Sequence, residues 1–365
     1  MNHEQTKATF DVQMMQRCLT LAIKAAGKTA PNPLVGSVIV KDGQIIGEGY
    51  HPGVGQPHAE IFALQDAGEE AAGATVYVNL EPCNHYGRTP PCSEALIAAK
   101  VAKVVTGMVD PDPRVAGGGI QKLRDAGIEV VVGIEESACR QLNEAFIHRV
   151  TYKQAFGILK YAMTLDGKIA AVTGHSAWVT SKASRHLVHQ TRSYCDAVVV
   201  GGNTVRQDNP NLTTHSLTEH NPLRVVMSRS LDLPESCNLW NTDVADTLIF
   251  TTEAKINSPL ATKLISRGVE IVPLEKLTPH NVMKHLYQRE LSQIFWECGG
   301  TLAAQAIADG VIQKIMAFIA PKIIGGTNAP SPVGDLGLTK MTEALELKNI
   351  EVQAIASDIL ITGYL

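Results

Sequence analysis

The residues best suited to chemistry lie between positions 58 and 92. A single alanine separates His58 from Glu60, and two cysteines follow, Cys83 directly after Pro82 and then Cys92. Zinc takes nitrogen and sulfur ligands in a tetrahedral arrangement, and a catalytic zinc site uses three protein ligands and leaves the fourth position to water. His58, Cys83 and Cys92 would supply the three ligands. Glu60 would then lie beside the water, where a carboxylate can carry protons.

Two simpler interpretations compete with a catalytic metal site. The three side chains could form a structural zinc site, for which His85 is the candidate fourth ligand, or they could be buried thiols and a core histidine. The spacing favours catalysis, because Glu60 and Pro82 both stand where hydrolytic deaminases of pyrimidine or purine rings have them. The sequence therefore predicts a zinc-dependent deaminase.

The loop between the two cysteines is longer than the two-residue spacer of the shortest deaminase form. Residues 84–91 read Asn-His-Tyr-Gly-Arg-Thr-Pro-Pro, so an amide, an imidazole and a guanidinium accompany the metal ligands. These groups suit a polar, phosphorylated substrate. The alternative is an ordinary Gly/Pro loop.

Composition restricts the classes of protein and partner. The chain has 365 residues, 45% of them hydrophobic, which is enough for two ordinary domains. Lys and Arg number 32 against 36 Asp and Glu, so the basic excess of a nucleic-acid-binding domain is absent and small polar substrates are expected. Seven scattered cysteines, no secretory segment and no apolar stretch of membrane-spanning length predict a cytoplasmic protein that binds neither nucleic acid nor membrane.

The elements that must position the first site alternate along the first half of the chain. An amphipathic helix is expected over 11–26, and two short strands, 35–40 and 44–49, are joined by the hairpin dipeptide Asp42-Gly43. Further helices are expected at 58–67, 92–99, 118–126 and 135–149, and further strands at 74–80, 103–108 and 129–133. This alternation predicts an α/β layered sheet, with the cysteine loop at the carboxyl end of a strand.

The second half is also expected to be α/β. A strand opens at 156, so we place the domains at 1–150 and 151–365. Helices are expected at 182–193, 280–289 and 300–309, and strands at 156–163, 197–200, 223–227, 247–251, 270–272, 293–297, 314–319 and after Glu346. Neither a Rossmann nor a Walker motif is present, but polar or glycine-rich turns at 166–168, 201–204 and 297–301 each follow a strand, where backbone amides can hold phosphate.

Several strings resemble a known family. In the first half they are Pro31-Asn32-Pro33-Leu34-Val35-Gly36, His51, the His58 motif and Glu81-Pro82-Cys83 with the loop to Cys92. In the second half they are Lys160, 163–168, Ser176, 178–181, 202–205 and 208–213. Together they resemble the bifunctional deaminase/reductase family of riboflavin biosynthesis, the RibD family, from the first helix to about Lys322.

The resemblance implies a fold and two reactions. The fold is an N-terminal cytidine-deaminase-like three-layer α/β/α domain followed by a C-terminal dihydrofolate-reductase-like α/β domain. The first domain would use Zn²⁺ to deaminate 2,5-diamino-6-ribosylamino-4(3H)-pyrimidinone 5′-phosphate, and the second would use NADPH to reduce the ribosyl group to ribityl. The substrates are therefore small pyrimidine ribotide phosphates. The family is commonly homo-oligomeric, and the apolar strand 358–365 is a candidate for pairing across an interface.

The resemblance also assigns residues. Glu60 is the catalytic acid and base, and the deaminase substrate contacts are Asn32, His51, His85 and Arg88. The NADPH contacts are Ala162, Trp178, Thr204, Asp208, Gly299, Gly300 and Thr301. The reductase substrate contacts are Lys160, Ser176, Arg192, Leu212, His215 and Glu297, and Lys160 and Asp208 are both expected near the ribose. Asn32 could instead be a turn residue, Trp178 and Leu212 core residues, and Arg192 and Lys160 surface charges.

One position departs from the family pattern. The family usually has an arginine where this chain has His215, whose charge near neutral pH depends on its surroundings because an unperturbed histidine has a pKa of about 6.5. The departure predicts that phosphate affinity in the reductase falls as the pH rises through the titration of His215.

Two other functions fit part of the pattern. One is a nucleoside or tRNA-base deaminase with a second domain that only binds a ligand. The other is a non-enzymatic binding protein with a structural zinc. Replacing Glu60 with alanine separates a deaminase, which would lose turnover and keep its metal, from a structural zinc protein, which would lose nothing.

Overall fold

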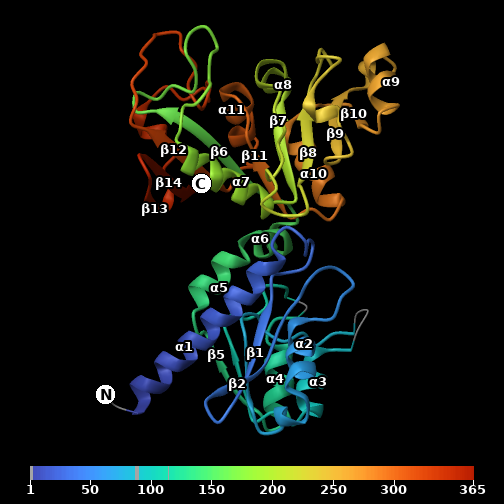
Figure 1. The fold of residues 1–365 in the computed structure, drawn as a ribbon, viewed down its shortest axis with the longest axis vertical. Helices are drawn as coiled ribbons and strands as arrows, with labels where there is room; N and C mark the ends of the chain where they lie inside the picture. The colour runs from blue at the N-terminus through green and yellow to red at the C-terminus, as the bar shows by residue number, and fades with distance from the viewer. Residues whose placement is uncertain (1–2, 87–89, 114) are drawn as a thin grey trace. The chain divides into compact units, whose positions relative to one another are not determined.

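The computed structural model describes residues 3–86, 90–113 and 115–365, and the chain forms two compact units, 1–153 and 154–365 (Figure 1). The boundary expected between 150 and 151 falls inside the last helix of the first unit, α6 (Glu144–Tyr152). Over the described ranges, no helix is both long enough and apolar enough to cross a membrane.

The first unit is built on a five-stranded sheet in the order β2-β1-β3-β4-β5. Its strands are β1 (Gly36–Lys41), β2 (Gln44–Tyr50), β3 (Thr75–Val78), β4 (Lys103–Thr106) and β5 (Glu129–Val132). The β1–β2 hairpin turns at Asp42 and Gly43, both of which have positive φ, as a two-residue hairpin turn requires. Strands β3, β4 and β5 are parallel, so their carboxyl ends share one edge.

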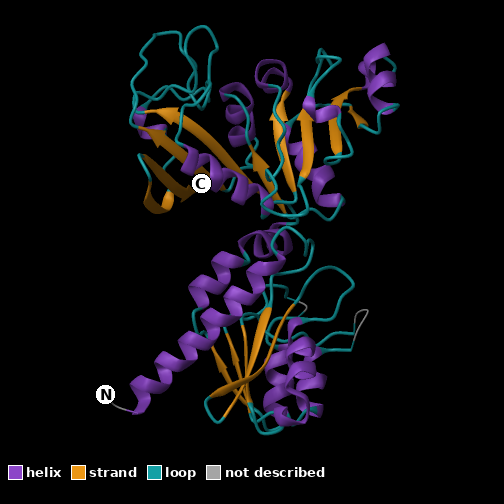
Figure 2. Cartoon of the chain, viewed as in Figure 1, coloured by secondary structure: helices purple, strands orange, loops and turns teal. Residues whose placement is uncertain are grey.

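Helices cover both faces of this sheet and make three layers (Figure 2). They are α1 (His3–Ala22), α2 (Ala59–Ala67), α3 (Cys92–Ala98), α4 (Gly118–Asp125), α5 (Glu136–Leu142) and α6. Helix α1 packs on β1 and contacts α5. Helix α2 packs on β2 and contacts α3, which in turn contacts α4. The prediction of a single helix over 135–149 is wrong, because the helix is interrupted at Asn143, between α5 and α6.

The second unit has a nine-stranded sheet in the order β10-β9-β8-β7-β11-β6-β12-β14-β13. The strands are β6 (Phe156–Thr164), β7 (Ala197–Gly201), β8 (Leu223–Met227), β9 (Thr247–Thr252), β10 (Glu270–Leu274), β11 (Gln293–Trp296), β12 (Lys314–Ala320), β13 (Lys348–Ile355) and β14 (Asp358–Tyr364). The first seven strands in the sheet order are parallel to one another, and β14 runs antiparallel to both of its neighbours, β12 and β13. Because β14 is paired on both sides, 358–365 is not an edge strand, and β13 is the edge instead.

Five helices accompany this sheet: α7 (Lys182–Ser193), α8 (Gly202–Asp208), α9 (Pro259–Ile265), α10 (Pro279–Gln288) and α11 (Gly300–Ala308). Two of them, α8 and α9, were not predicted. Helix α8 follows β7 directly and begins in the glycine-rich stretch interpreted as a turn. Helix α9 carries a readable signal, since Ser258 Oγ accepts the Ala261 N–H at 3.2 Å and Pro259 occupies the first helical position.

Two candidate active sites

Close packing of α2 on β2 positions His58 and Glu60. A Cβ added to Gly47 would lie 2.4 Å from the Ala63 oxygen, and one added to Gly49 would lie 2.4 Å from the Ala59 oxygen, so only glycine fits at either position. Both alanines are fully buried. His58 stands immediately before the first residue of α2, and Glu60 lies in its first turn.

A second close contact fixes the turn that carries Cys83. The buried Glu81 carboxylate accepts four backbone N–H groups at 2.9–3.2 Å, from Asp110, Gly117, Gly119 and Ile120. These groups form the approach to α4 and its first turn, where a carboxylate also stabilises the helix dipole. A Cβ on Gly119 would lie 2.0 Å from the Pro82 oxygen, so glycine is required where α4 meets the Pro82–Cys83 turn.

Asn84 and Ser93 join the two cysteine segments. Asn84 Nδ2 donates to the Gly118 oxygen at 3.2 Å, and Ser93 Oγ donates to Asn84 Oδ1 at 3.1 Å. Cys92 begins α3, and its backbone N–H donates to Cys83 Sγ at 3.3 Å. These bonds bring two cysteines nine residues apart in sequence to one point.

The three proposed ligand atoms converge on a volume of the right size for zinc. His58 Nδ1 lies 3.5 Å from Cys83 Sγ and 3.3 Å from Cys92 Sγ, and all three ligand atoms lie within 4.8 Å of one another. Ordinary Zn–N and Zn–S bond lengths in a tetrahedron place nitrogen and sulfur roughly 3.6 Å apart. The residues therefore fit zinc, with His58, Cys83 and Cys92 as ligands and one position left open.

Electrostatics at this site favour metal binding and proton transfer. Hydrogen bonds from Cys92 and His58 lower the pKa of Cys83 well below its usual value against the opposing effect of burial, and the hydrogen bond between the two cysteines, together with burial, raises the pKa of Cys92. Glu60 is 3% exposed, and its burial together with the Cys83 charge raises its carboxyl pKa to about 7. A carboxyl with a pKa near the working pH can both take and give a proton.

Two of the four predicted deaminase substrate contacts lie beside the metal ligands. Asn32 Nδ2 lies 3.0 Å from His51 Nε2, and His51 Nδ1 lies 3.0 Å from the Pro57 oxygen. The His51 ring is 5.4 Å from that of His58, and burial lowers the pKa of His51, which keeps this ring neutral. His85 is exposed in the loop after Cys83, and Arg88 lies outside the described residues.

Two asparagines that the sequence reasoning did not identify hold the segment with Asn32. Asn79 accepts the Gly36 N–H at 2.8 Å and donates to the Leu34 oxygen at 2.9 Å. Asn143, at the break between α5 and α6, accepts the Leu34 N–H at 2.8 Å and donates to the Leu34 oxygen at 3.0 Å. The helix break therefore has a role, because it aims an amide at the loop next to the zinc ligands.

Asp110 was also missed. It follows β4 at the same sheet edge, and burial raises its pKa to about 6, against an opposing hydrogen bond from the Asp112 N–H. The Glu81 charge adds to the rise and His85 opposes it. A carboxyl with a perturbed pKa, bonded through its backbone N–H to Glu81 of the Cys83 turn, is a candidate functional group. Its signal in the sequence was the polar turn after a predicted strand.

In the second unit, three predicted substrate contacts form one ion-pair cluster. Arg192 binds Glu297 through Nε at 2.5 Å and Nη2 at 3.1 Å, and Lys160 Nζ lies 3.5 Å from the same carboxylate. Burial alone would raise the pKa of Glu297, but the positive charges of Arg192 and then Lys160 outweigh the effect of burial and lower this pKa to about 2. Glu297 is therefore ionised, and Lys160 and Arg192 are not isolated surface charges.

The loop after α8 is tied to this cluster. Arg192 Nη1 donates to the Thr213 oxygen at 2.9 Å, and Leu212 is 3% exposed, so it anchors the loop in the core. The exposed His215 stacks on the ring of His189 with centroids 3.9 Å apart. Burial, and then Arg192, lower the pKa of His215.

The remaining predicted contacts spread over several elements. Ser176 Oγ donates to Asp208 Oδ1 at 3.2 Å at the end of α8, the helix that contains Thr204. The residues 299–301 lie at the start of α11, shortly after β11, and Ala162 lies in β6. Trp178 is 67% exposed, and its ring centroid lies 4.3 Å from the Arg185 guanidinium carbon. Lys160 and Asp208, both expected near the ribose, fall into two groups, one around Glu297 and the other with Ser176.

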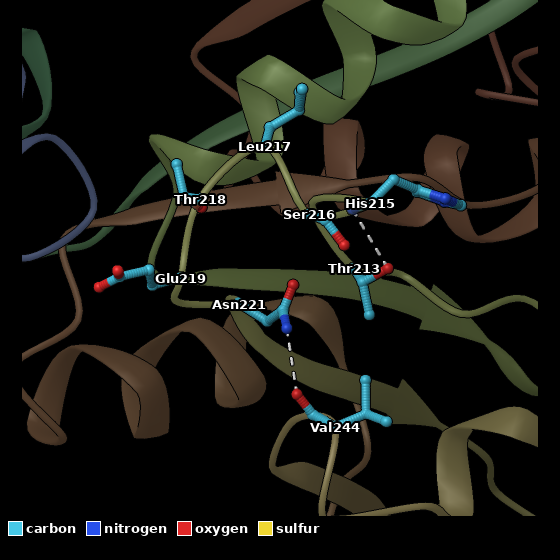
Figure 3. Close-up of a pocket in the computed structure, with 8 residues that line it drawn as sticks. All are labelled: Thr213, His215, Ser216, Leu217, Thr218, Glu219, Asn221 and Val244. Carbon is cyan, nitrogen blue, oxygen red and sulfur yellow. Dashed lines mark hydrogen bonds between the residues drawn. The ribbon is translucent and has the colours of Figure 1, made fainter.

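A hollow of about 650 Å³ is lined mostly by residues of the His215 loop (Figure 3). Its lining residues are Thr213, His215, Ser216, Leu217, Thr218, Glu219, Asn221 and Val244. Figure 3 shows the His215 ring extending away from Asn221 and Val244. Lys160, Arg192 and Glu297 are not among its lining residues, but the hollow adjoins their cluster through Thr213, whose oxygen accepts a hydrogen bond from Arg192.

Comparison with known proteins defines the class of each unit. Residues 8–108 match the cytidine and deoxycytidylate deaminase zinc-binding region, and residues 155–361 match the RibD C-terminal domain. The chain thus joins a zinc-dependent, cytidine-deaminase-like unit to a reductase unit.

Similarity to relatives extends over the whole chain. It is 62% identical to the riboflavin biosynthesis protein RibD of Synechocystis sp. over 97% of this chain and 96% of that protein. It matches the structure of Acinetobacter baumannii RibD with 37% identity and a TM-score of 0.85. It matches the Thermotoga maritima diaminohydroxyphosphoribosylaminopyrimidine deaminase/5-amino-6-(5-phosphoribosylamino)uracil reductase with 35% identity and a TM-score of 0.88. Each structural match covers 98% of this chain and 99% of the other.

The chain belongs to the RibD family. It is a bifunctional enzyme of riboflavin biosynthesis, a zinc-dependent deaminase and an NADPH-dependent reductase. The expected fold, the two activities and both cofactors are confirmed. The two other functions considered, a base deaminase with a non-catalytic second domain and a binding protein with structural zinc, are thereby rejected.

Proposed function

We propose that residues 1–153 deaminate 2,5-diamino-6-ribosylamino-4(3H)-pyrimidinone 5′-phosphate and that residues 154–365 reduce the ribosyl group of the product to ribityl. The observation that carries the proposal is the pairing of two unlike sites in one chain. His58, Cys83 and Cys92 converge beside the buried Glu60 in one unit, and Lys160 and Arg192 surround Glu297 in the other.

In the deaminase, Glu60 is the proton carrier. Zinc, when bound by His58, Cys83 and Cys92, lowers the pKa of a water to near neutrality. The Glu60 carboxylate would accept one proton from that water as the water oxygen bonds to the ring carbon, and would pass it to a ring nitrogen. It would then move the second proton from the added oxygen to the amine, which would leave as ammonia while the oxygen remains on the ring as a carbonyl. Asn32, supported by its bond to the neutral His51, orients the pyrimidine, and His85 and Arg88 contact its polar substituents.

In the reductase, the side chains orient the sugar and carry charge. NADPH, when bound, supplies the hydride for the ribosyl carbon. Lys160, Ser176, Arg192, Leu212, His215 and Glu297 are the proposed substrate contacts. The ionised Glu297 fixes the Arg192 and Lys160 heads, so these two cations are in place before the phosphorylated substrate arrives.

The proposed cofactor contacts lie where a dinucleotide phosphate can be held. The residues 299–301 form the start of α11, whose backbone N–H groups point out of the helix. Thr204 and Asp208 lie in α8, which follows the neighbouring strand β7. Ala162 and Trp178 complete the set.

We further propose that the chain self-associates through β13. This edge strand is exposed along its length, with Ile350 57% and Val352 67% exposed. A second copy of β13 would cover these side chains and complete the ladder of hydrogen bonds. Sedimentation should show an oligomer that V352K dissociates; a wild-type monomer at micromolar concentration would contradict this part of the proposal.

We also propose a cytoplasmic location, which the odd number of scattered cysteines supports.

A coupled assay tests the two activities together. Purified, zinc-quantified protein receives the diaminopyrimidinone ribotide; ammonia release is followed first, and NADPH oxidation is followed after the cofactor is added. We expect both signals in sequence. Ammonia release without NADPH oxidation would refute the reductase assignment, and the absence of both signals from zinc-replete protein would refute the proposal.

A further inference from the structure

Two histidine rings lie against each other beside the ion-pair cluster of the second unit. The imidazoles of His189, in α7, and His215, in the loop after α8, are stacked with centroids 3.9 Å apart and planes 17° apart. His189 precedes Arg192 by three residues, so the two side chains share one face of α7. The mechanism proposed above gives His189 no role.

The backbone of the loop is held so that His215 reaches this partner. Leu212 is buried, and Arg192 Nη1 donates to the Thr213 oxygen at 2.9 Å. His215 has a φ of 52°, in the left-handed region that residues other than glycine seldom adopt. The His215 side chain is exposed, whereas His189 is half-buried. The ring of His189 is therefore the surface on which the ring of His215 rests.

Charge in the cluster points to an anion at this place. Arg192 commits Nε and Nη2 to Glu297 and Nη1 to Thr213, and Lys160 lies 3.5 Å from the same carboxylate. Two cations and one carboxylate leave a net charge of +1 when the histidines are neutral. Nε, Nη1 and Nη2 of Arg192 already donate to Glu297 and Thr213. A new positive charge on His215 would therefore contribute most to the binding of an anion on the exposed side of the cluster.

We propose that His189 is a positioning residue of the reductase: it holds the His215 imidazole against the substrate phosphate, and phosphate binding is coupled to uptake of one proton by His215. The inference deepens the proposed reductase function and rests on it. His189 contributes an aromatic face and does not itself touch the substrate.

The charged groups around the pair fix the sign of the pH dependence. His189 faces His215, Arg192, Glu297 and His186, and His215 faces Arg192 and Glu297. Burial, followed by His215 and Arg192, lowers the pKa of His189 to about 4, and burial followed by Arg192 lowers that of His215, so the surroundings disfavour a charge on either ring without ligand. A bound anion raises the pKa of His215. Binding is therefore strong below the pKa of His215 in the free protein, weakens by up to about tenfold per pH unit between that pKa and the raised pKa of the complex, and stays weak above the raised pKa.

Steady-state kinetics of the reductase with the deaminated substrate, between about pH 6 and about pH 9, separate positioning from folding. H189A should raise KM at the acid end by about 3- to 10-fold, the contribution of one aromatic pair, and leave kcat within about twofold. H189F keeps a ring without a titrating group and should stay within about twofold of the wild type. H186A, an exposed histidine on the same helix, is the matched control and should change nothing.

Substitutions at His215 complete the test. H215R carries a permanent charge, so its KM should be low and independent of pH, whereas H215F should bind weakly at every pH. The KM of the wild type should be close to that of H215R at the acid end and should approach that of H215F as the pH rises. A pH-independent wild-type KM, an H189A enzyme identical to H186A, or an H189F enzyme as impaired as H189A would each overturn the inference.

One readout does not need turnover. In NMR titrations of the histidine ring protons, inorganic phosphate should raise the pKa of His215 in the wild type and in H189F, and H189A should need about 3- to 10-fold more phosphate for the same rise. If the wild type does not oxidise NADPH, the reductase assignment fails, and this titration still decides the role of the pair. A His215 pKa that phosphate does not move in the wild type would refute the role of the pair in anion binding.

Discussion

The two sites differ in how the chain assembles them. The deaminase ligands come from a short stretch, residues 58 to 92, and converge because glycines let α2 and α4 approach β2 and the Pro82–Cys83 turn. The reductase cluster joins Lys160, Arg192 and Glu297 from β6, α7 and the end of β11, far apart in sequence. The first site leaves three ligands open toward a metal, whereas in the second two cations share one carboxylate. Steric fit therefore governs the first site, and charge balance governs the second.

The sharpest way to break this comparison is to remove one ligand. C92S should abolish zinc binding and reduce ammonia release by at least about a thousandfold, because the metal and its activated water are lost together. Reduction of the deaminated substrate should be unaffected. Metal analysis and separate assays of the two half-reactions give the result, and C237S, a cysteine outside both sites, is the control. Equal loss of both activities would show that the two sites are not independent.

Steric fit at the first site predicts a contrast between neighbouring glycines. G119A should destabilise the first unit by about 3 kcal/mol or more, since the new Cβ would lie 2.0 Å from the Pro82 oxygen. G118A, whose Cβ would lie 3.6 Å from Asn84 Nδ2, should be close to neutral. Chemical denaturation compares the two variants. Equal stability would mean that this close approach does not position Cys83.

Charge balance at the second site predicts acid sensitivity. The pKa of Glu297 is lowered to about 2, so its pairing contributes stability above the ordinary carboxyl pKa, and this is lost as the pH falls from about 4.5 towards 2. The contribution is about 3 kcal/mol. E297Q should therefore destabilise the second unit at neutral pH, with the difference from wild type shrinking in acid. Denaturation as a function of pH measures it. E235Q, in an exposed ion pair, should have little effect at any pH.

A smaller effect separates the two cations of the cluster. K160Q should lower the reductase kcat/KM by about tenfold, since Arg192 still holds Glu297 when the more distant Lys160 charge is removed. Zinc content and ammonia release should not change. A reductase unaffected by K160Q would show that Lys160 only balances charge.

Sequence patterns were most informative where neighbouring residues determine the structure. The three residues predicted as zinc ligands come together in the structure, and the predicted hairpin turn lies at Asp42-Gly43, where both residues have the positive φ of a tight turn. They failed where tertiary contacts decide. Asn143 breaks the helix expected over 135–149 because its amide binds Leu34, more than a hundred residues away, and a helical pattern does not show such a partner.

The reductase site shows the same limit. Arg192 and Glu297 were each suggested by family resemblance, but their bidentate pair depends on how α7 meets the end of β11. The stacking of His189 on His215 depends on a left-handed backbone at His215, which its residue type does not favour. Strand 358–365 was expected to be a candidate for pairing across an interface, but it pairs with β12 and β13 within the sheet, and the sequence of a strand does not show whether both of its edges are occupied.

The central claim is that Glu60 carries protons for one of two independent reactions, and E60Q tests it most directly. Zinc content, ammonia release from the diaminopyrimidinone ribotide and NADPH oxidation with the deaminated substrate would be measured on the same preparation. The account predicts about one zinc per chain, at least about a thousandfold slower ammonia release and unchanged NADPH oxidation. Ammonia release at the wild-type rate with zinc still bound would contradict it.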